Sequence, residues 1–190
     1  MNPQKVLLFC GKRKSGKDFL TEWLCKHLNA EENDKQAVIV RLSGPLKQCY
    51  AENHGLDFQK LLDASDYKEK YRKDMIAWSE KIRNEDPSYF CLKAIEHYKA
   101  EQYHIWIISD CRRKTDFQFF DSRFTDDKTM KIRIWASEEV RVQRGFSFQG
   151  GVDDAESERG LDDHENFDFI VENNGNVEPH ELLKNVVNSI

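Results

Sequence analysis

Short apolar segments alternate with longer amphipathic segments along the whole chain. The apolar segments predict strands, and their near-continuous apolar character is typical of parallel strands that are covered on both faces. The amphipathic segments predict helices, so the alternation indicates an α/β domain with a mostly parallel sheet and right-handed crossovers. The predicted strands are 5–10, 37–42, 104–110, 131–136 and 167–173, and the predicted helices are 16–29, 66–84, 87–101, 113–122, 137–144 and 178–188.

The segment 145–165 fits neither pattern. It contains four glycines and seven acidic residues without apolar periodicity, and it lies between the fourth and fifth predicted strands. Such a composition is typical of a loop that closes over a site. We therefore expect a lid at about 145–165 within a single domain that spans residues 1–190.

The stretch GKRKSGKD, residues 11–18, has the form of a phosphate-binding loop between the first strand and the first helix. Its backbone N–H groups would converge on phosphate oxygens at a helix N-terminus, and Lys17 would bridge the outer phosphates. Asp18 replaces the usual hydroxyl, and Mg²⁺ accepts a carboxylate ligand readily. The alternative is a chance turn rich in Gly and Lys. The stretch predicts binding of ATP and Mg²⁺ by Gly11, Lys12, Arg13, Lys14, Ser15, Gly16, Lys17 and Asp18.

Composition narrows the class of protein. The chain has 39% apolar residues, twelve of them Phe, which is enough to form a hydrophobic core. Its 33% of charged residues indicates a hydrated surface, and the two together are typical of a small enzyme. The net charge of −5 argues against nonspecific nucleic-acid binding, and no apolar run reaches membrane-spanning length. The five cysteines form no C-x-x-C pair, and there is no signal peptide or peroxisomal C-terminal tripeptide. We expect a cytoplasmic monomer whose partner is a small molecule, with no nucleic acid and no membrane.

More cations lie near the loop than one nucleotide needs. Lys12, Arg13 and Lys14 lie inside it and suggest a second anionic group, such as a phosphate on the acceptor; a solvated basic turn is the alternative. Arg112 and Arg113 follow the third predicted strand, at the edge of the sheet where α/β proteins bind ligands.

Asp110, at the end of the third predicted strand, stands where an acid would hold Mg²⁺ directly or through water. An ordinary capping aspartate is the alternative.

Two further groups of cations are candidates for binding the acceptor, because of their position in the chain. Lys68 and Arg72 share a helix face, and Lys47 and Arg83 lie in the same region between the second and third strands; a solvated helix face is the competing interpretation. Small P-loop kinases bind the acceptor in that region, so we expect an acceptor-binding part at about 43–100.

Arg141 and Arg144 precede the lid and could reach the transferring phosphate, or they could pair with Glu138, Asp153 or Asp154 instead.

Six stretches resemble those of animal-type phosphomevalonate kinases, in the same order and at similar spacing. The resemblance runs from about residue 5 to 175, and the loop with its aspartate is highly specific to that family. It implies a three-layer P-loop kinase fold, with a mostly parallel five-stranded sheet, flanking helices and a lid. The stretches are LLFCGKRKSGKDFLTE, RLSGPLKQCYAENHGLDFQKLLD, YKEKYRKDMIAW, ISDCRRKTD, QRGFSFQGGVDDAESERGLD and DFIVENNG.

The resemblance also implies a reaction of the mevalonate route to isoprenoids. The γ-phosphoryl group of ATP passes to the phosphate of (R)-5-phosphomevalonate, which gives 5-diphosphomevalonate and ADP with Mg²⁺. It implies catalytic roles for Lys17, Arg112, Arg113, Arg141 and Arg144, and it adds Arg144 and Asn174 to the nucleotide-binding loop. It implies substrate binding by Lys12, Arg13, Lys47, Lys68, Arg72, Arg83, Arg112, Arg113 and Asn173, and substrate binding or catalysis by Arg133. The expected metal ligands remain Asp18 and Asp110, on the residue arguments given above.

Two positions depart from the family pattern. Leu92 stands where an arginine is common, and Asn174 stands where a histidine is usual. Two rival functions remain open from the residues. One is a kinase of the same fold that phosphorylates a nucleoside monophosphate or another small metabolite. The other is a nucleotide-dependent switch, against which the chain lacks the guanine-binding N-K-x-D pattern.

Overall fold

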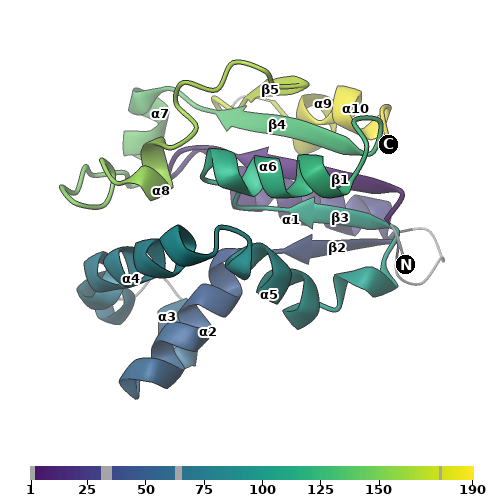
Figure 1. The fold of residues 1–190 in the computed structure, drawn as a ribbon. Helices are drawn as coiled ribbons and strands as arrows, with labels where there is room; N and C mark the ends of the chain where they lie inside the picture. The colour runs from purple at the N-terminus through teal and green to yellow at the C-terminus, as the bar shows by residue number, and fades with distance from the viewer. Residues whose placement is uncertain (1–2, 31–35, 63–65, 176) are drawn as a thin grey trace.

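The structure, a computed structural model, describes residues 3–30, 36–62, 66–175 and 177–190. Its sheet has five strands that all run parallel, which confirms the predicted α/β class (Figure 1). Along the sheet the order is β2-β3-β1-β4-β5, with the first strand at the centre. The strands are β1 Lys5–Cys10, β2 Ala37–Val40, β3 Ile105–Ile108, β4 Thr129–Trp135 and β5 Phe169–Glu172.

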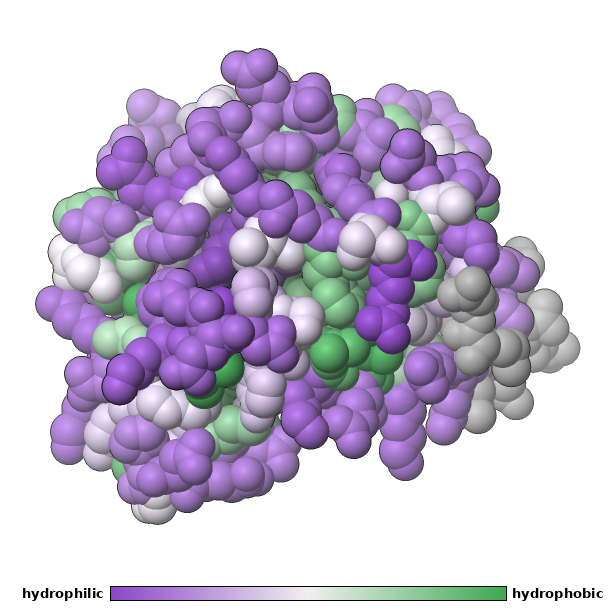
Figure 2. Space-filling view, viewed as in Figure 1, coloured by the Kyte–Doolittle hydropathy of each residue, from purple (hydrophilic) through white to green (hydrophobic). Residues whose placement is uncertain are grey.

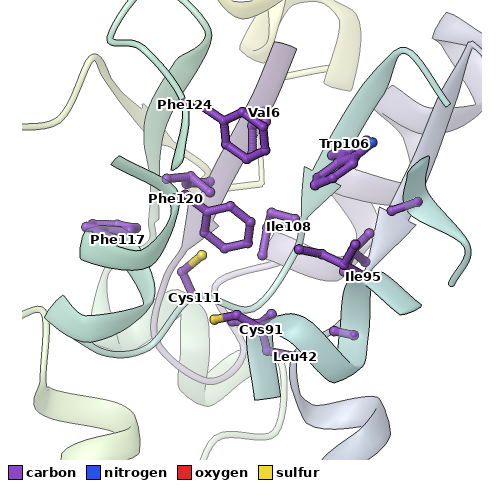
Figure 3. Close-up of a cluster of buried hydrophobic side chains, with 14 of the residues drawn as sticks. Val6, Leu42, Cys91, Ile95, Trp106, Ile108, Cys111, Phe117, Phe120 and Phe124 are labelled. Carbon is purple, nitrogen blue, oxygen red and sulfur yellow. The ribbon is translucent and has the colours of Figure 1, made fainter. Parts of the chain in front are cut away.

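Alternate side chains of the central strand pack into two separate cores, one on each face of the sheet. Val6 and Leu8 lie in the core covered by helices α5 (Tyr89–His97) and α6 (Lys114–Arg123), part of which is drawn in Figure 3. Leu7 and Phe9 lie in the core covered by α1 (Lys17–Leu28) and the short C-terminal helices α9 (Pro179–Leu182) and α10 (Lys184–Val187). Because both faces are covered, the strands are near-continuous apolar runs, and the three-layer prediction is confirmed.

A helical subdomain between β2 and β3 has its own small core. It consists of α2 (Ser43–His54), α3 (Phe58–Leu62) and α4 (Asp66–Glu85), which pack around Tyr50, Leu61 and Met75. Only α4 was predicted from the sequence. The first turn of α2 contains Gly44 and Pro45, and this helix lacks a clear apolar stripe, so local pattern gave no signal for it.

The remaining differences concern short elements. The lid segment contains one turn of helix, α8 (Glu156–Arg159), where only a loop was expected, and it follows α7 (Glu138–Gln143). The predicted helix 87–101 is α5 followed by the 3₁₀ turn η1 (Ala100–Gln102), and the predicted helix 178–188 is divided at Leu183 into α9 and α10.

All five strand arrows point toward the side of the molecule where α4, α7 and α8 lie, so the carboxyl edge of the sheet faces these helices (Figure 1). Hydrophilic side chains cover most of the face shown in Figure 2, and hydrophobic atoms are visible mainly in recesses between them. Within the described ranges, no helix combines the length and the apolar character needed to cross a membrane.

Candidate functional site

The loop between β1 and α1 has a backbone that requires its glycines. Gly16 has φ +86°, in the left-handed region, and a Cβ atom there would overlap the side-chain amide of Asn173. A Cβ atom on Gly11 would lie 2.5 Å from the carbonyl oxygen of Ile134 on the neighbouring strand. Both glycines therefore allow the loop to lie against the rest of the sheet edge, as the phosphate-loop prediction requires.

Three side chains from outside the loop hold its carbonyl oxygens. The Nε of Arg141 donates to the carbonyl oxygen of Arg13 at 2.8 Å. The carbonyl oxygen of Ser15 accepts from Arg144 at 3.1 Å and from the Nδ2 of Asn173 at 2.9 Å. In a trans peptide the N–H points opposite to the C=O, so the next N–H groups in the loop are turned toward the other side, where an anion can meet them.

Arg141 and Arg144 thus contact the loop backbone, and neither forms one of the described ion pairs with the acids proposed as alternative partners. Of those acids, Asp153 pairs with Arg13 at 2.8 Å. Asn173 accepts a further bond from Arg144 at 3.3 Å and is buried. The two arginines and Asn173 therefore fix the shape of the loop, a role that spacing alone did not indicate.

Lys17 and Asp18 begin helix α1 at the mouth of the loop, with the Nζ of Lys17 2.6 Å from the Oδ1 of Asp18. Desolvation pushes the pKa of Asp18 upward, but the positive charges of Lys17, Arg41 and Arg112 outweigh it, so the pKa lies below its ordinary value. Asp18 is therefore an anion at neutral pH, and its side chain is exposed.

Asp110 follows β3 closely, lines a hollow beside α2 and is buried. Its Oδ1 accepts from the backbone N–H of Leu42 at 2.6 Å, and its Oδ2 accepts from that of Ser43 at 3.1 Å. The capping interaction that the sequence left open is present, because these two N–H groups begin helix α2. Each carboxylate oxygen still has a second lone pair.

The predicted acceptor cations gather between the helical subdomain and the loop after β3. Lys47, Arg72, Arg83, Arg112 and Arg113 line one hollow there, together with Asp110 and Glu158. Arg72 and Arg112 also line the hollow over the phosphate loop, which joins the two regions. The side chain of Lys68 lies outside what the structure describes.

Asp116 of α6 contacts three of these arginines and was missed from the sequence. Its side chain is fully buried, and its Oδ1 accepts from Arg83 at 2.8 Å. Its Oδ2 accepts from the backbone N–H groups of Arg112 at 2.8 Å and Arg113 at 3.1 Å. Arg113 in turn pairs with Glu80, while burial and the nearby Arg83 lower its pKa. A local signal existed, since an acid in the first turn of a helix is a common cap.

Acids of the lid segment pair with cations of the site. Asp153 pairs with Arg13, Asp162 with Lys12, and Glu158 with Arg112. The Nζ of Lys12 also donates to the carbonyl oxygen of Glu158 at 2.8 Å. The number of acids in 145–165 predicted a lid, but it did not indicate which cations they meet, because the partners lie far away in the chain: 46 positions separate Glu158 from Arg112, and 140 separate Asp153 from Arg13.

Three further residues from the sequence analysis line neither the hollow over the phosphate loop nor the acceptor hollow. Arg133 on β4 donates to the carbonyl oxygen of Leu161 and lies over the ring of Phe167 at 4.3 Å, so it holds the end of the lid segment. The Oδ1 of Asn174 accepts from the N–H of Ser137 at 3.0 Å, just before α7. Leu92 is exposed on α5 and lines a separate hollow with Trp106.

Comparison with known proteins agrees with this geometry. Residues 9–126 match the family model described as phosphomevalonate kinase. A protein of Drosophila melanogaster named phosphomevalonate kinase is 39% identical over 171 residues, which are 89% of this chain and 88% of that protein. Among solved structures, the Mycobacterium tuberculosis APS kinase CysC, in complex with AMPPNP and APS, superposes with a TM-score of 0.50 over 99% of this chain and 98% of that one, at 12% identity. This last likeness concerns the fold.

Proposed function

Since the chain belongs to the phosphomevalonate kinase family and is an ATP-dependent kinase for phosphomevalonate, we propose that its two sets of cations divide the work between donor and acceptor. The loop of residues 11–18 holds the phosphates of ATP. The cations of α4 and of the loop after β3 hold the phosphate of the acceptor. The observation that carries this assignment is the shared hollow, in which Arg72 and Arg112 face the phosphate loop itself.

The chemistry explains why so many cations are needed. A phosphate that accepts a phosphoryl group carries negative charge toward a donor that is also negative, so the two repel each other. Lys17 on the outer phosphates, with Arg112 and Arg113 on the acceptor, would neutralise this charge and hold the reacting groups in line. The acceptor oxygen is already ionised near neutral pH, so it attacks the γ-phosphorus without a general base.

Residues around the loop take positioning roles in the proposal. Arg141, Arg144 and Asn173 would keep the loop carbonyls turned away, which leaves its N–H groups for the phosphates. Arg144 and Asn174 lie on the nucleotide side. Lys12, Arg13, Lys47, Lys68, Arg83 and Arg133 would supply positive charge around the acceptor and the lid.

The residues present fit a magnesium ion. Asp18 offers an exposed anionic oxygen beside Lys17, and Asp110 keeps lone pairs that could bond to a metal-bound water. Mg²⁺ usually binds through one or two carboxylates plus substrate phosphates and waters. Among the described residues, no three or more His, Cys, Asp or Glu side chains lie close enough together to hold a metal ion by themselves. A site of one or two carboxylates is consistent with that arrangement. When bound, the ion would neutralise charge on the β- and γ-phosphate oxygens.

Asp18→Asn tests the metal assignment. We expect the Mg²⁺ concentration for half-maximal activity to rise about tenfold, the scale of one lost charged ligand contact. The measurement is ADP release against Mg²⁺ concentration at fixed ATP. Glu22→Gln is the matched control, because Glu22 is an exposed acid on the same helix that pairs with Arg41. An unchanged magnesium response of Asp18→Asn would remove this residue from the metal site.

The acceptor itself is tested by a coupled assay of ADP release. Phosphomevalonate, mevalonate and a panel of nucleoside monophosphates would be compared with ATP and Mg²⁺. Turnover with phosphomevalonate alone is expected, because the acceptor cations match a small and highly anionic molecule. Turnover with a nucleoside monophosphate instead would keep the loop assignment and overturn the acceptor assignment.

We also propose that the protein acts as a cytoplasmic monomer without a nucleic-acid partner. The net charge of −5 supports the last point, since a phosphate backbone would be repelled. Size-exclusion chromatography with light scattering tests the oligomeric state, and a dimer would contradict the proposal.

A further inference from the structure

A carboxylate of the chain itself lies between two cations of the acceptor region. The Oε1 of Glu158, on α8, pairs with the Nη1 of Arg112 and lies 3.9 Å from the Nη2 of Arg72. Its side chain is only 5% exposed, whereas that of Arg112 is 31% exposed. Glu158 lines both the hollow over the phosphate loop and the acceptor hollow. One internal anion thus lies at the junction of the two regions.

This position excludes an acceptor phosphate that uses the same two arginines. The Nη1 of Arg112 already donates to Glu158 and to the carbonyl oxygen of Ser157, the latter at 3.1 Å. A phosphate placed there would meet a buried carboxylate of the same sign, and such like-charge contacts are strongly unfavourable at low dielectric. Either the phosphate binds elsewhere or Glu158 leaves.

Movement of Glu158 would also affect the donor side. Its carbonyl oxygen accepts from the Nζ of Lys12 in the phosphate loop, and Lys12 pairs with Asp162 at the far end of the same segment. The helix that carries Glu158 is a single turn, and short helices have little stability of their own. Displacing the carboxylate would therefore release α8 and remove one of the two described contacts of Lys12, which would keep its pair with Asp162.

We propose that Glu158 is an internal competitor for the acceptor phosphate and thereby sets acceptor affinity. The acceptor binds by replacing the Glu158 carboxylate at Arg72 and Arg112. This replacement also removes the hydrogen bond from Lys12 to the carbonyl oxygen of Glu158, which leaves Asp162 as the described partner of Lys12. The proposal rests on the function proposed above, because it places the acceptor phosphate at Arg72 and Arg112.

The variant Glu158→Gln tests the proposal, since glutamine keeps the shape and loses the charge. We expect the dissociation constant of phosphomevalonate, measured by calorimetry without nucleotide, to fall about 3- to 10-fold, the scale of one partly buried ion pair. Glu156→Gln is the matched control, because Glu156 is an exposed acid on the same helix. It lines neither the acceptor hollow nor the hollow over the phosphate loop, so the dissociation constant of this variant should equal that of the wild type. Unchanged or weaker binding by Glu158→Gln would overturn the proposal.

A second measurement uses the wild-type protein and does not depend on the variant folding. The amide N–H groups of Glu158, Arg159 and Gly160 donate to the carbonyl oxygens of Ala155 and Glu156 within this turn. Their hydrogen exchange should become faster when phosphomevalonate is added alone, because α8 is released. Slower or unchanged exchange would contradict displacement.

The two hypotheses fail in different ways. If wild-type protein does not turn over phosphomevalonate, the proposed acceptor is wrong whatever Glu158 does. In that case inorganic pyrophosphate serves as the probe, and its affinity should still rise in Glu158→Gln. If turnover is normal and neither ligand binds more tightly to the variant, the competitor role alone is wrong.

Discussion

Replacing Lys17 with methionine is expected to lower turnover by about 10³-fold or more while the fold stays intact, because one positioned phosphate contact is worth that much in phosphoryl transfer. Lys17 opens α1 directly after the left-handed Gly16, and its nearest described partner is the exposed Asp18. Methionine is unbranched and one atom shorter than lysine, so it keeps most of the apolar stem and removes the ammonium group that would bridge the outer phosphates. The measurement is ADP release, with circular dichroism and thermal unfolding as checks of folding.

Lys26→Met provides the matched control for that prediction. Lys26 is exposed in the last turn of the same helix, at the end of α1 opposite to the loop. Its substitution removes the same charge and adds the same apolar atoms, so turnover should stay near the wild-type rate. Normal turnover by Lys17→Met would remove the phosphate loop from the mechanism.

Replacing Asp116 with alanine is expected to give the largest loss of stability, about 3–5 kcal/mol, which is the usual cost of leaving one partner of a buried ion pair alone. The change would strand the guanidinium of Arg83, whose side chain is 7% exposed, and two backbone N–H groups of the loop after β3. Urea unfolding of the variant and the wild type measures the difference in free energy. Asp116→Asn should lose less, because an amide oxygen can still accept a hydrogen bond.

Asp121→Asn is the control on the same helix. Asp121 pairs with Lys131 at 2.8 Å, and its side chain is 33% exposed, so loss of the charge should cost about 1 kcal/mol or less. A similar small loss in Asp116→Ala would mean that the Arg83 guanidinium finds water or another acceptor. The buried network would then not be what fixes the arginines after β3.

The sequence predicted those parts of the fold that are determined by residues close together in the chain. Each strand is a short apolar run, and each was found to within a few residues, as with 5–10 for β1 and 37–42 for β2. The helix α2 was missed because its start is held by Asp110, which lies 68 residues beyond Leu42 in the chain. No local pattern encodes such a cap.

The candidate site likewise has residues that the sequence could identify and partners that it could not. The phosphate loop is contiguous, so its glycines and Lys17 could be identified from eight residues, and the sheet edge located Arg112 and Arg113. The partners of these cations could not be identified, because Glu158 meets Arg112 across 46 positions and Asp153 meets Arg13 across 140. Charge composition predicts that such pairs form, whereas only the tertiary structure decides which ones.

The internal acids also explain how a site so rich in cations can fold without substrate. Arg13, Arg83 and Arg112 each have a carboxylate partner, in Asp153, Asp116 and Glu158. Buried charges of one sign are costly without such partners. Asp116 is fully buried, whereas Asp153 and Glu158 belong to the lid segment, and exchange for a ligand phosphate is proposed for Glu158.

The central claim is that this site joins two phosphates, and ³¹P nuclear magnetic resonance of the product tests it most directly. The protein would be incubated with ATP, Mg²⁺ and phosphomevalonate, and the phosphorylated product isolated. The account predicts two product resonances that show phosphorus–phosphorus coupling, as in a diphosphate. Two uncoupled phosphate monoester resonances would contradict it, because the phosphoryl group would then have gone to a hydroxyl group of the acceptor.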